Sequence, residues 1–394
     1  MINRRSLFGA TAAFASLVAS TLGGRKALAK TGAFADVEPR GSVGRMERLP
    51  RLDLESQQDF LTGFRVWVNN DMRQAASRRF NEILDTNKIS RDADLPLDKV
   101  LELAENDPVI ATSVRTWLSG QQLIWKTIQD EFHNNADTYL AEMETADSAG
   151  PGTLELNPEM DVPEYAKHEI HIQPGGYVGD PFAGHINHYG VNAFYAGRNY
   201  QDEVQGAIAA NVKTPPDGQV KRILDLGCAT GRLTFAMKER FPDAEVWGID
   251  VGGPMVRYAH MRAADMGLDC HFAQRLAEDN KFADNHFDLV VSYIMFHEMP
   301  QAVTQRVIRE TYRVLRPGGV FFPVDFKTGK QEPKMTPQRN FSLWWDHRWN
   351  NEPWRVEFTS RDFGDSIAAV GFKVDEDFRS ARRGHGAIMA VKPA

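Results

Sequence analysis

The residues best suited to chemistry lie in one short turn. Asp225, Gly227, Ala229 and Gly231 stand in the order acid-x-Gly-x-small-x-Gly, directly after the apolar segment 222–226. Small residues at this spacing let a compact ligand lie directly on the backbone. A carboxylate at the end of the apolar segment can face a ligand's ammonium group. The turn therefore predicts a binding site for a compact ligand with a positively charged end.

The same turn does not fit the two common phosphate-binding motifs. A dinucleotide fingerprint needs G-x-G-x-x-G, but Ala229 and Arg232 stand in place of its second and third glycines. A P-loop needs Gly-Lys-Ser/Thr, and no such triplet follows Gly231. Asp250 ends the next apolar segment, where an acid can accept hydrogen bonds from ribose hydroxyls. The pattern favours a transferase over a dehydrogenase.

A second group of candidate residues follows the apolar segment 287–293. It holds Ser292, Tyr293, His297 and Glu298. In a parallel sheet, ligands bind at the carboxyl ends of the strands, so these side chains should reach the same site as the turn. His297 is the predicted catalytic base. The alternative is that it caps the following helix or packs against the substrate.

The elements that must position these residues alternate. From about residue 220 onward, apolar runs of strand length alternate with amphipathic stretches. This predicts an α/β fold with a doubly wound, mostly parallel, seven-stranded sheet. Between Leu54 and Ala146 the apolar spacing is helical, with Asp53 as a plausible N-cap. Helices are expected near 97–105, 108–118 and 120–145, the last two separated at Ser119-Gly120.

The C-terminal half resembles the class I S-adenosylmethionine-dependent methyltransferases, particularly the group with ubiquinone- and sterol-type enzymes. The segments RILDLGCATG, FDLVVSYIMFHEMP and VLRPGGVFFPVDF carry the resemblance. It implies a Rossmann-like fold and S-adenosyl-L-methionine as cofactor. It also implies that the turn holds the methionine part and that Asp250 takes the ribose hydroxyls. The predicted cofactor-binding residues are Asp225, Gly227, Ala229, Gly231, Asp250, Val251, Ala277, Glu278, Ser292 and Tyr189. Leu276 stands where the family's acid contacts the adenine amine, and a backbone group near Ala277 is its expected replacement.

Two clusters are expected to shape the acceptor site. The first, residues 164–219, should fold over the cofactor as a lid; it contributes Tyr189 and Tyr195 and contains four histidines within 21 residues. Paired H-x-x-H spacings can bind a metal, but glycines and a proline between them suggest a loop, and no metal is predicted. The second holds four tryptophans after residue 343, as a wall for the acceptor or as packing against the N-terminal helices. The predicted substrate-binding residues are Tyr195, Tyr293, Glu298, Trp344 and Trp345.

The first thirty residues resemble a twin-arginine export signal. Arg4-Arg5 precede a moderately apolar stretch, which ends in Ala27-Leu28-Ala29, a small-x-small cleavage pattern. A periplasmic protein and a partnership with the twin-arginine export machinery are therefore expected. A cytoplasmic or membrane-tethered protein is the alternative. The expected division is a signal peptide 1–30, a disordered tether 31–49, a helical domain 50–147, a linker 148–163, the lid 164–219 and a methyltransferase domain 220–394.

Composition narrows the class of partner. The net charge is −7, and it becomes −12 when the five basic residues of the first thirty are left out. An acidic body argues against nucleic acid as the main partner. A small-molecule methyl acceptor and a possible homodimer through the helical domain are expected. The alternative function is a non-catalytic cofactor-binding protein that retains the methyltransferase fold.

Overall fold

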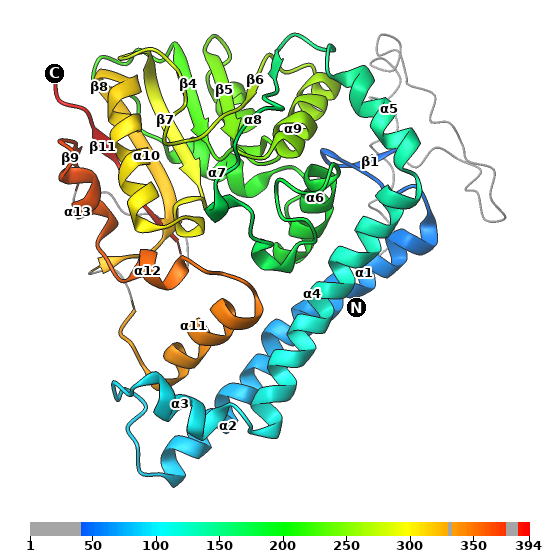
Figure 1. The fold of residues 1–394 in the computed structure, drawn as a ribbon, viewed down its shortest axis with the longest axis vertical. Helices are drawn as coiled ribbons and strands as arrows, with labels where there is room; N and C mark the ends of the chain where they lie inside the picture. Colours follow the sequence, from blue (N-terminus) through cyan, green and yellow to red (C-terminus); the bar gives the residue numbers. More distant parts are fainter. Residues whose placement is uncertain (1–40, 330–332, 376–384) are drawn as a thin grey trace, which may run out of the picture.

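A computed structural model describes residues 41–329, 333–375 and 385–394. A twisted sheet, parallel except at one end, forms the centre of the α/β part, with helices on both faces (Figure 1). Its strands are β3 (Leu154–Glu155), β4 (Arg222–Leu226), β5 (Glu245–Asp250), β6 (His271–Gln274), β7 (Phe287–Tyr293), β8 (Leu315–Phe326), β9 (Lys373–Val374), β10 (His385–Ala387) and β11 (Ala390–Val391).

The strand order is β3-β6-β5-β4-β7-β8-β11-β9, and β10 also pairs with β8. Strands β3 to β8 pair in parallel, whereas β10 and β11 run antiparallel to β8. The order reverses at β4, whose neighbours are β5 and β7, and a crevice opens there at the carboxyl ends of the strands.

The doubly wound sheet confirms the predicted fold class, but the number of strands was wrong. Within the described residues it has nine strands instead of seven. The additional edge strand is β3, which lies in the predicted linker 148–163 and pairs with β6. The antiparallel return is also split into two short strands, β10 and β11, which both pair with β8.

Alternation along the buried strands explains why both faces are covered. Ile223 packs in the apolar cluster beneath α7 and α8, and its neighbour Leu224 packs in the cluster beneath α10 and α13. Successive side chains of a strand point to opposite faces, so a continuous apolar run requires helices on both sides. The helices of this part are α6 (Ala183–Phe194), α7 (Glu203–Asn211), α8 (Arg232–Arg240), α9 (Gly253–Met266), α10 (Gln301–Val314), α11 (Pro337–Trp349), α12 (Arg355–Thr359) and α13 (Phe363–Ala368).

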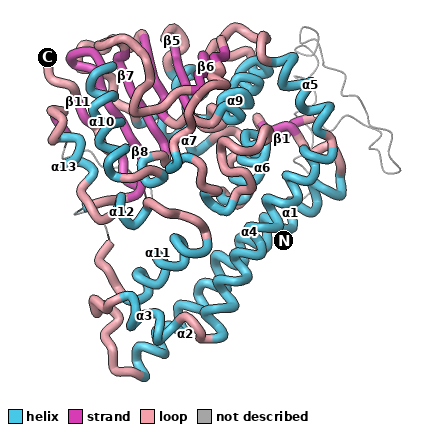
Figure 2. The backbone as a smooth tube through the Cα atoms, in the orientation of Figure 1, coloured by secondary structure: helices cyan, strands magenta, loops and turns pink. Residues whose placement is uncertain are grey.

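The N-terminal helices form an arm that extends away from the sheet (Figure 2). They are α1 (Leu52–Trp67), α2 (Arg73–Thr86), α3 (Leu97–Ala104), α4 (Pro108–Asn134) and α5 (Ala136–Ala146). A π-helical turn, Val68–Met72, joins α1 to α2. Helix α11 packs against α3 near the far end of the arm, so a segment of the C-terminal half returns to the N-terminal helices (Figure 1).

The predicted helix break at Ser119-Gly120 was wrong, because α4 runs unbroken through both residues. Gly120 has another purpose. A Cβ added there would lie 3.2 Å from the Phe64 ring, so the glycine lets α1 approach α4 closely. The chain breaks instead at Asn135, between α4 and α5.

The N-terminal boundary also differs from the prediction. Residues 41–49 of the predicted disordered tether contain the hairpin β1 (Ser42–Val43) and β2 (Met46–Glu47). The side chains of Met46 and Leu49 are buried, which gives this segment a folded core contact. Residues 31–40 and the predicted signal peptide lie outside the described residues. Helix α1 begins at Leu52 with Arg51 as its N-cap, so Asp53 lies in the first turn.

Across the described part of the chain, none of the helices has both the length and the apolar character needed to span a bilayer.

Candidate functional site

A cavity of about 390 Å³ lies at the carboxyl ends of β4, β5 and β7. Its lining comes from three parts of the chain: the turn after β4 with the ends of the neighbouring strands, the segment 164–219, and the residues that follow β7 and β8. Lining residues include Tyr165, His171, Tyr177, Tyr195, Asp225, Gly227, Cys228, Ala229, Arg232, Asp250, Val251, Ala277, Tyr293, Met295, His297 and Glu298.

The turn between β4 and α8 is built from left-handed backbone. Gly227 has φ +63°, Ala229 +48° and Gly231 +81°. A Cβ on Gly227 would lie 2.7 Å from Met295, and one on Gly231 would lie 2.5 Å from the Phe235 ring. Both glycines are therefore required by packing as well as by conformation. The turn leaves its backbone open to the cavity.

Asp250 is fixed at the floor of the cavity by two backbone donors. Its Oδ2 accepts the N–H of Ala229 at 3.0 Å, and its Oδ1 accepts the N–H of Gly252 at 2.8 Å. A carboxylate has about four lone-pair sites, so it can still accept hydroxyl groups. Burial raises the pKa of Asp250 against the lowering effect of these donors. The carboxylate fits the ribose diol of S-adenosylmethionine.

Asp225, which is buried, provides a second acid at the same cavity. Its Oδ2 accepts the hydroxyl of Thr234 at 2.7 Å. Burial raises its pKa to about 7, Thr234 opposes the rise, and the charge of Asp250 adds to it. An ammonium group placed here would stabilise the ionised form. The two acids and the open turn fit a cofactor that has a ribose and an amino-acid end.

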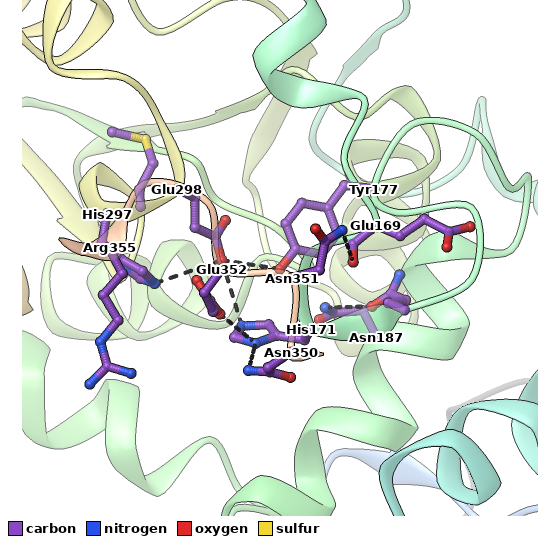
Figure 3. Close-up of polar contacts among 12 residues, drawn as sticks. Glu169, His171, Tyr177, Asn187, His297, Glu298, Asn350, Asn351, Glu352 and Arg355 are labelled. Carbon is purple, nitrogen blue, oxygen red and sulfur yellow. Dashed lines mark hydrogen bonds and ion pairs between the residues drawn. The ribbon is translucent and has the colours of Figure 1, made fainter. Parts of the chain in front are cut away.

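On another side of the cavity a partly buried polar cluster gathers from distant parts of the chain (Figure 3). His171 comes from the 3₁₀ turn Ile170–Ile172, Glu298 from the 3₁₀ turn Phe296–Glu298, and Glu352 from the loop after α11. Nδ1 of His171 lies 2.7 Å from Oε1 of Glu352, and its Nε2 lies 3.7 Å from Oε1 of Glu298. The hydroxyl of Tyr177 donates to Glu298 at 3.2 Å.

The pKa values in this cluster are moved by burial and by charge together. Burial raises the pKa of Glu298 to about 7, although His297 and His171 oppose the rise. The pKa of Glu352 is lowered, because the charge and hydrogen bond of His171 outweigh burial. A carboxyl group that titrates near neutral pH beside two imidazoles can hold or move a proton.

His297, the predicted base, is held by Asp325. Its Nδ1 lies 2.8 Å from Oδ1 of Asp325, and the other oxygen of that carboxylate accepts the N–H of Met295 and of Phe296. Burial lowers the pKa of His297, but the charge and hydrogen bond of Asp325 outweigh it and raise the pKa to about 9. Its side chain lines the cavity and is 1% exposed.

Most of the predicted site residues do line this one cavity. They are Asp225, Gly227, Ala229, Asp250, Val251, Ala277, Tyr195, Tyr293, His297 and Glu298. Gly231 is not a lining residue; it is the N-cap of α8. The hydroxyls of Tyr195 and Tyr293 lie 3.4 Å apart, so a residue of the predicted lid meets the end of β7.

Three predicted cofactor contacts lie elsewhere. Tyr189 points away from the cavity, and its hydroxyl donates to the backbone carbonyl of Glu47 at 2.8 Å. The side chain of Ser292 is fully buried in β7. Glu278 binds the Tyr165 hydroxyl at 2.8 Å, so Tyr165 takes the place at the cavity wall that was predicted for Glu278.

The predicted aromatic wall for the acceptor was wrong. Trp344 packs against Phe341, and Trp345 meets Trp117 of α4 edge to face with ring centroids 5.1 Å apart. Both tryptophans join the apolar cluster formed by α2, α3 and α4. They serve the alternative purpose, packing of α11 against the N-terminal helices, because those helices present a complementary apolar face.

Sequence reasoning missed Tyr177 and Glu352, and it gave His171 no role of its own. The H-x-x-H spacing drew attention to 168 and 171 together, but these rings separate. His168 lies against Trp354, and His171 faces the cavity. Nothing near Glu352 in the sequence marks it as a site residue. Among the described residues no group of three or more His, Cys, Asp or Glu side chains is placed to hold a metal ion.

Comparisons with known proteins agree with this geometry. Residues 223–319 match a protein family described as a methyltransferase domain. The demethylmenaquinone methyltransferase of Thermus thermophilus is 40% identical over 106 residues, which cover 27% of this chain and 47% of that protein. The malonyl-[acyl-carrier protein] O-methyltransferase of Methylococcus capsulatus is 30% identical over 198 residues, which cover 48% of this chain and 66% of that protein. The chain thus spans about half to two thirds of the length of these relatives.

Among solved structures, phosphoethanolamine N-methyltransferase 2 of Haemonchus contortus in complex with S-adenosyl-L-methionine aligns with a TM-score of 0.35 and 18% identity. The alignment covers 49% of this chain and 53% of that one. The strand order and the turn with its two acids agree with the matched sequence segment: residues 223–319 of this chain match a methyltransferase domain.

Proposed function

We propose that this protein transfers a methyl group from S-adenosylmethionine to a small-molecule acceptor. The observation that carries the proposal is the pair of acids at the cavity, the buried Asp225 and the half-buried Asp250, on either side of an open left-handed turn. The cofactor supplies a methyl carbon on a positively charged sulfur, which a nucleophile displaces in line. The protein's part is to hold the reacting groups at attack distance, which contributes up to roughly 7–11 kcal/mol to the barrier reduction.

The acceptor would enter beside the polar cluster. Tyr195, Tyr293 and Phe326 give this part of the cavity aromatic surface, and Glu298 gives it a titratable group. A partly apolar cavity with a few convergent polar groups suits a small organic acceptor. The two relatives are, by their names, methyltransferases of demethylmenaquinone and of malonyl-[acyl-carrier protein]; neither acceptor is assigned to this chain.

His297 was predicted to act as the base, and its environment supports a different role. With a pKa of about 9, its imidazole carries a proton at neutral pH. A buried imidazolium bound to Asp325 fixes the end of β8 against the turn after β7. It also places positive charge near Glu298, at 3.9 Å, and thereby favours the ionised form of that carboxyl group.

The test is methyl transfer by the purified protein. The chain is mixed with methyl-labelled S-adenosylmethionine and a small-molecule extract of cells, and labelled products are separated by mass. We expect a product one methyl heavier than an extract component, and its loss in Asp250→Asn. Donor affinity, measured by calorimetry, should fall at least tenfold in that variant, because hydrogen bonds to a charged group contribute about 1.5–3 kcal/mol each. Asp243→Asn, at an exposed acid, is the control. Wild-type protein that binds the donor without transferring its methyl group would instead support the non-catalytic binding protein.

We further propose that the first thirty residues act as a twin-arginine signal and that the body is periplasmic. The paired arginines, the apolar stretch and the Ala-x-Ala end occur in order at workable spacing. The twin-arginine route carries folded proteins, and it suits a chain that folds around a cofactor before export. The donor is made in the cytoplasm, so an exported enzyme needs a bound donor or a separate supply.

A further inference from the structure

His171 is a titratable group at the cavity that lies outside the residues matched by the methyltransferase family. It belongs to the segment 164–219, and its partner Glu352 comes from the loop after α11. Its side chain is 24% exposed, whereas that of His297 is 1% exposed. Of these two imidazoles at the cavity, His171 is therefore the more exposed.

The contacts of His171 set the direction of its ring. A carboxylate that accepts a hydrogen bond from Nδ1 keeps a proton on that nitrogen. Nε2 is then the nitrogen that can gain or lose a second proton. Glu352, whose side chain is 4% exposed, provides that carboxylate at 2.7 Å. Nε2 points toward Glu298 across 3.7 Å, a gap wider than a hydrogen bond. Figure 3 shows contacts from the ring to both carboxylates, with Asn350 beside Nδ1.

The backbone at this position is strained and is held from the helical arm. His171 has φ +57°, and the following Ile172 has φ +51°, which is rare for a β-branched residue. The carbonyl of His171 accepts the indole N–H of Trp125 at 2.9 Å and the amide of Gln121 at 3.4 Å, both from α4. Backbone strain of this kind persists where surrounding contacts enforce it, and it is common at functional sites. The arm thus positions the side chain that faces the cavity.

We propose, on the basis of the methyl transfer proposed above, that His171 accepts the proton of the methyl acceptor and that Glu352 orients it. In this step an O–H or N–H bond of the acceptor breaks and the proton moves to Nε2 of His171. The electron pair of that atom forms the bond to the methyl carbon, while the C–S electron pair returns to sulfur and gives a neutral thioether. The acceptor class is a hydroxyl or amine group that must lose a proton to be methylated.

The charges around His171 predict how the reaction depends on pH. It faces Glu352, Glu298 and His297, with Tyr177 and Asn350 at the edge of the group. Burial lowers the pKa of His171, but the two carboxylates outweigh burial and His297, and the pKa is raised above 6.5. Because only the neutral imidazole accepts a proton, kcat/KM should rise with pH through a value above 6.5.

Three single variants of the full chain test the proposal, with the labelled donor and the small-molecule extract as the probe. His171→Gln should lower methyl transfer by about 10²–10⁴-fold, the usual contribution of a general base. Glu352→Gln should lower transfer and should move the pH dependence to lower pH, because a negative charge beside the imidazole is gone. His168→Gln, three residues earlier with its ring against Trp354, should transfer at the wild-type rate.

Two measurements made without a methyl acceptor accompany the assay. Calorimetry should show wild-type donor affinity in all three variants. NMR titration should show a lower pKa for His171 in Glu352→Gln than in the wild type. A His171→Gln protein as active as His168→Gln, or an unchanged pKa of His171 in Glu352→Gln, would overturn the proposal. Absence of transfer by the wild type would instead overturn the methyltransferase function on which it rests.

Discussion

At the scale of single residues, the site contains carboxyl groups whose ionised form is disfavoured by burial when no cofactor is bound. Asp225 is 1% exposed, has one hydroxyl partner and shows a pKa of about 7, against an ordinary value of 3.8. A cofactor with a positively charged amine compensates for the burial of this carboxylate. Binding and ionisation of Asp225 are therefore coupled.

This coupling predicts the direction in which donor affinity changes with pH. Between pH 5 and 7 the free protein holds a proton on Asp225, and donor binding should release it, so donor affinity should rise with pH through this window. Calorimetry in two buffers of different ionisation enthalpy measures the released proton. Asp225→Asn should bind more weakly and release no proton from this site. Equal proton release by the wild type and by Asp225→Asn would contradict the assignment.

At the scale of elements, close packing between α4 and α6 supports the site. Gly190 of α6 lies against Trp125 of α4, and a Cβ added to it would lie 2.0 Å from the indole ring. Protein interiors tolerate such overlap poorly, since overpacking commonly costs about 1–3 kcal/mol. The same indole holds the carbonyl of His171, so the helix contact and the site geometry are linked.

Two glycine-to-alanine variants in helices should therefore have opposite effects. Gly190→Ala should lower the free energy of unfolding by about 1–3 kcal/mol, because the indole must move. Gly206→Ala in α7 is the matched control, since an added Cβ there meets nothing within 4 Å. It should raise stability by about 0.5–1 kcal/mol through higher helix propensity. Urea unfolding of both variants measures the difference, and a loss of stability in each would argue against this packing account.

At the scale of the whole molecule, the helical arm contacts the α/β part in several places, and two of them bear on the site. One is the site itself, where α4 holds the segment 164–219 through Trp125 and Gln121. The other is the distant contact of α11 with α2, α3 and α4. After β8, the chain therefore packs on the arm through α11. The loop after α11 then brings Glu352 back to the cavity. The arm thus helps to shape the proposed acceptor site through both contacts.

This arrangement predicts that the arm affects turnover without affecting the cofactor. Trp125→Phe removes the N–H donor to His171 but keeps a ring in the core. Transfer should fall about tenfold to a hundredfold, since small displacements of reacting groups have effects of this size. Donor affinity by calorimetry should remain at the wild-type value. Trp344→Phe, in the distant α11 contact, is the control, and an equal loss of transfer in both variants would point to general destabilisation.

Location in the cell is the other prediction at this scale. Cells that make the native chain are fractionated, and the N-terminus of the product is sequenced. We expect a periplasmic protein that begins at Lys30, after cleavage behind Ala29. Arg4→Lys combined with Arg5→Lys should keep the chain uncut in the cytoplasm. Cytosolic, uncut wild-type protein that does not respond to this double change would refute the signal.

The sequence by itself determined the α/β order and the cofactor turn, because both depend on local information. Apolar runs of strand length, small residues at Gly227 and Gly231, and an acid at the end of β5 are close in the chain, and steric rules at φ > 0 act residue by residue. The doubly wound sheet follows from that alternation. The match of residues 223–319 to a methyltransferase domain agrees with what these local patterns predicted.

Only the tertiary structure decided the rest, because it depends on contacts between distant segments. Glu352 meets His171 across 181 positions of sequence, and no local pattern of residue types encodes that distance. From the sequence, the tryptophans of α11 could equally well bind a ligand or pack against the N-terminal helices. In the fold they contact the apolar face of the arm, so they pack. Burial, which sets the pKa of Asp225 and of Glu298, is likewise a property of the assembled core, since it measures how much water the whole fold excludes.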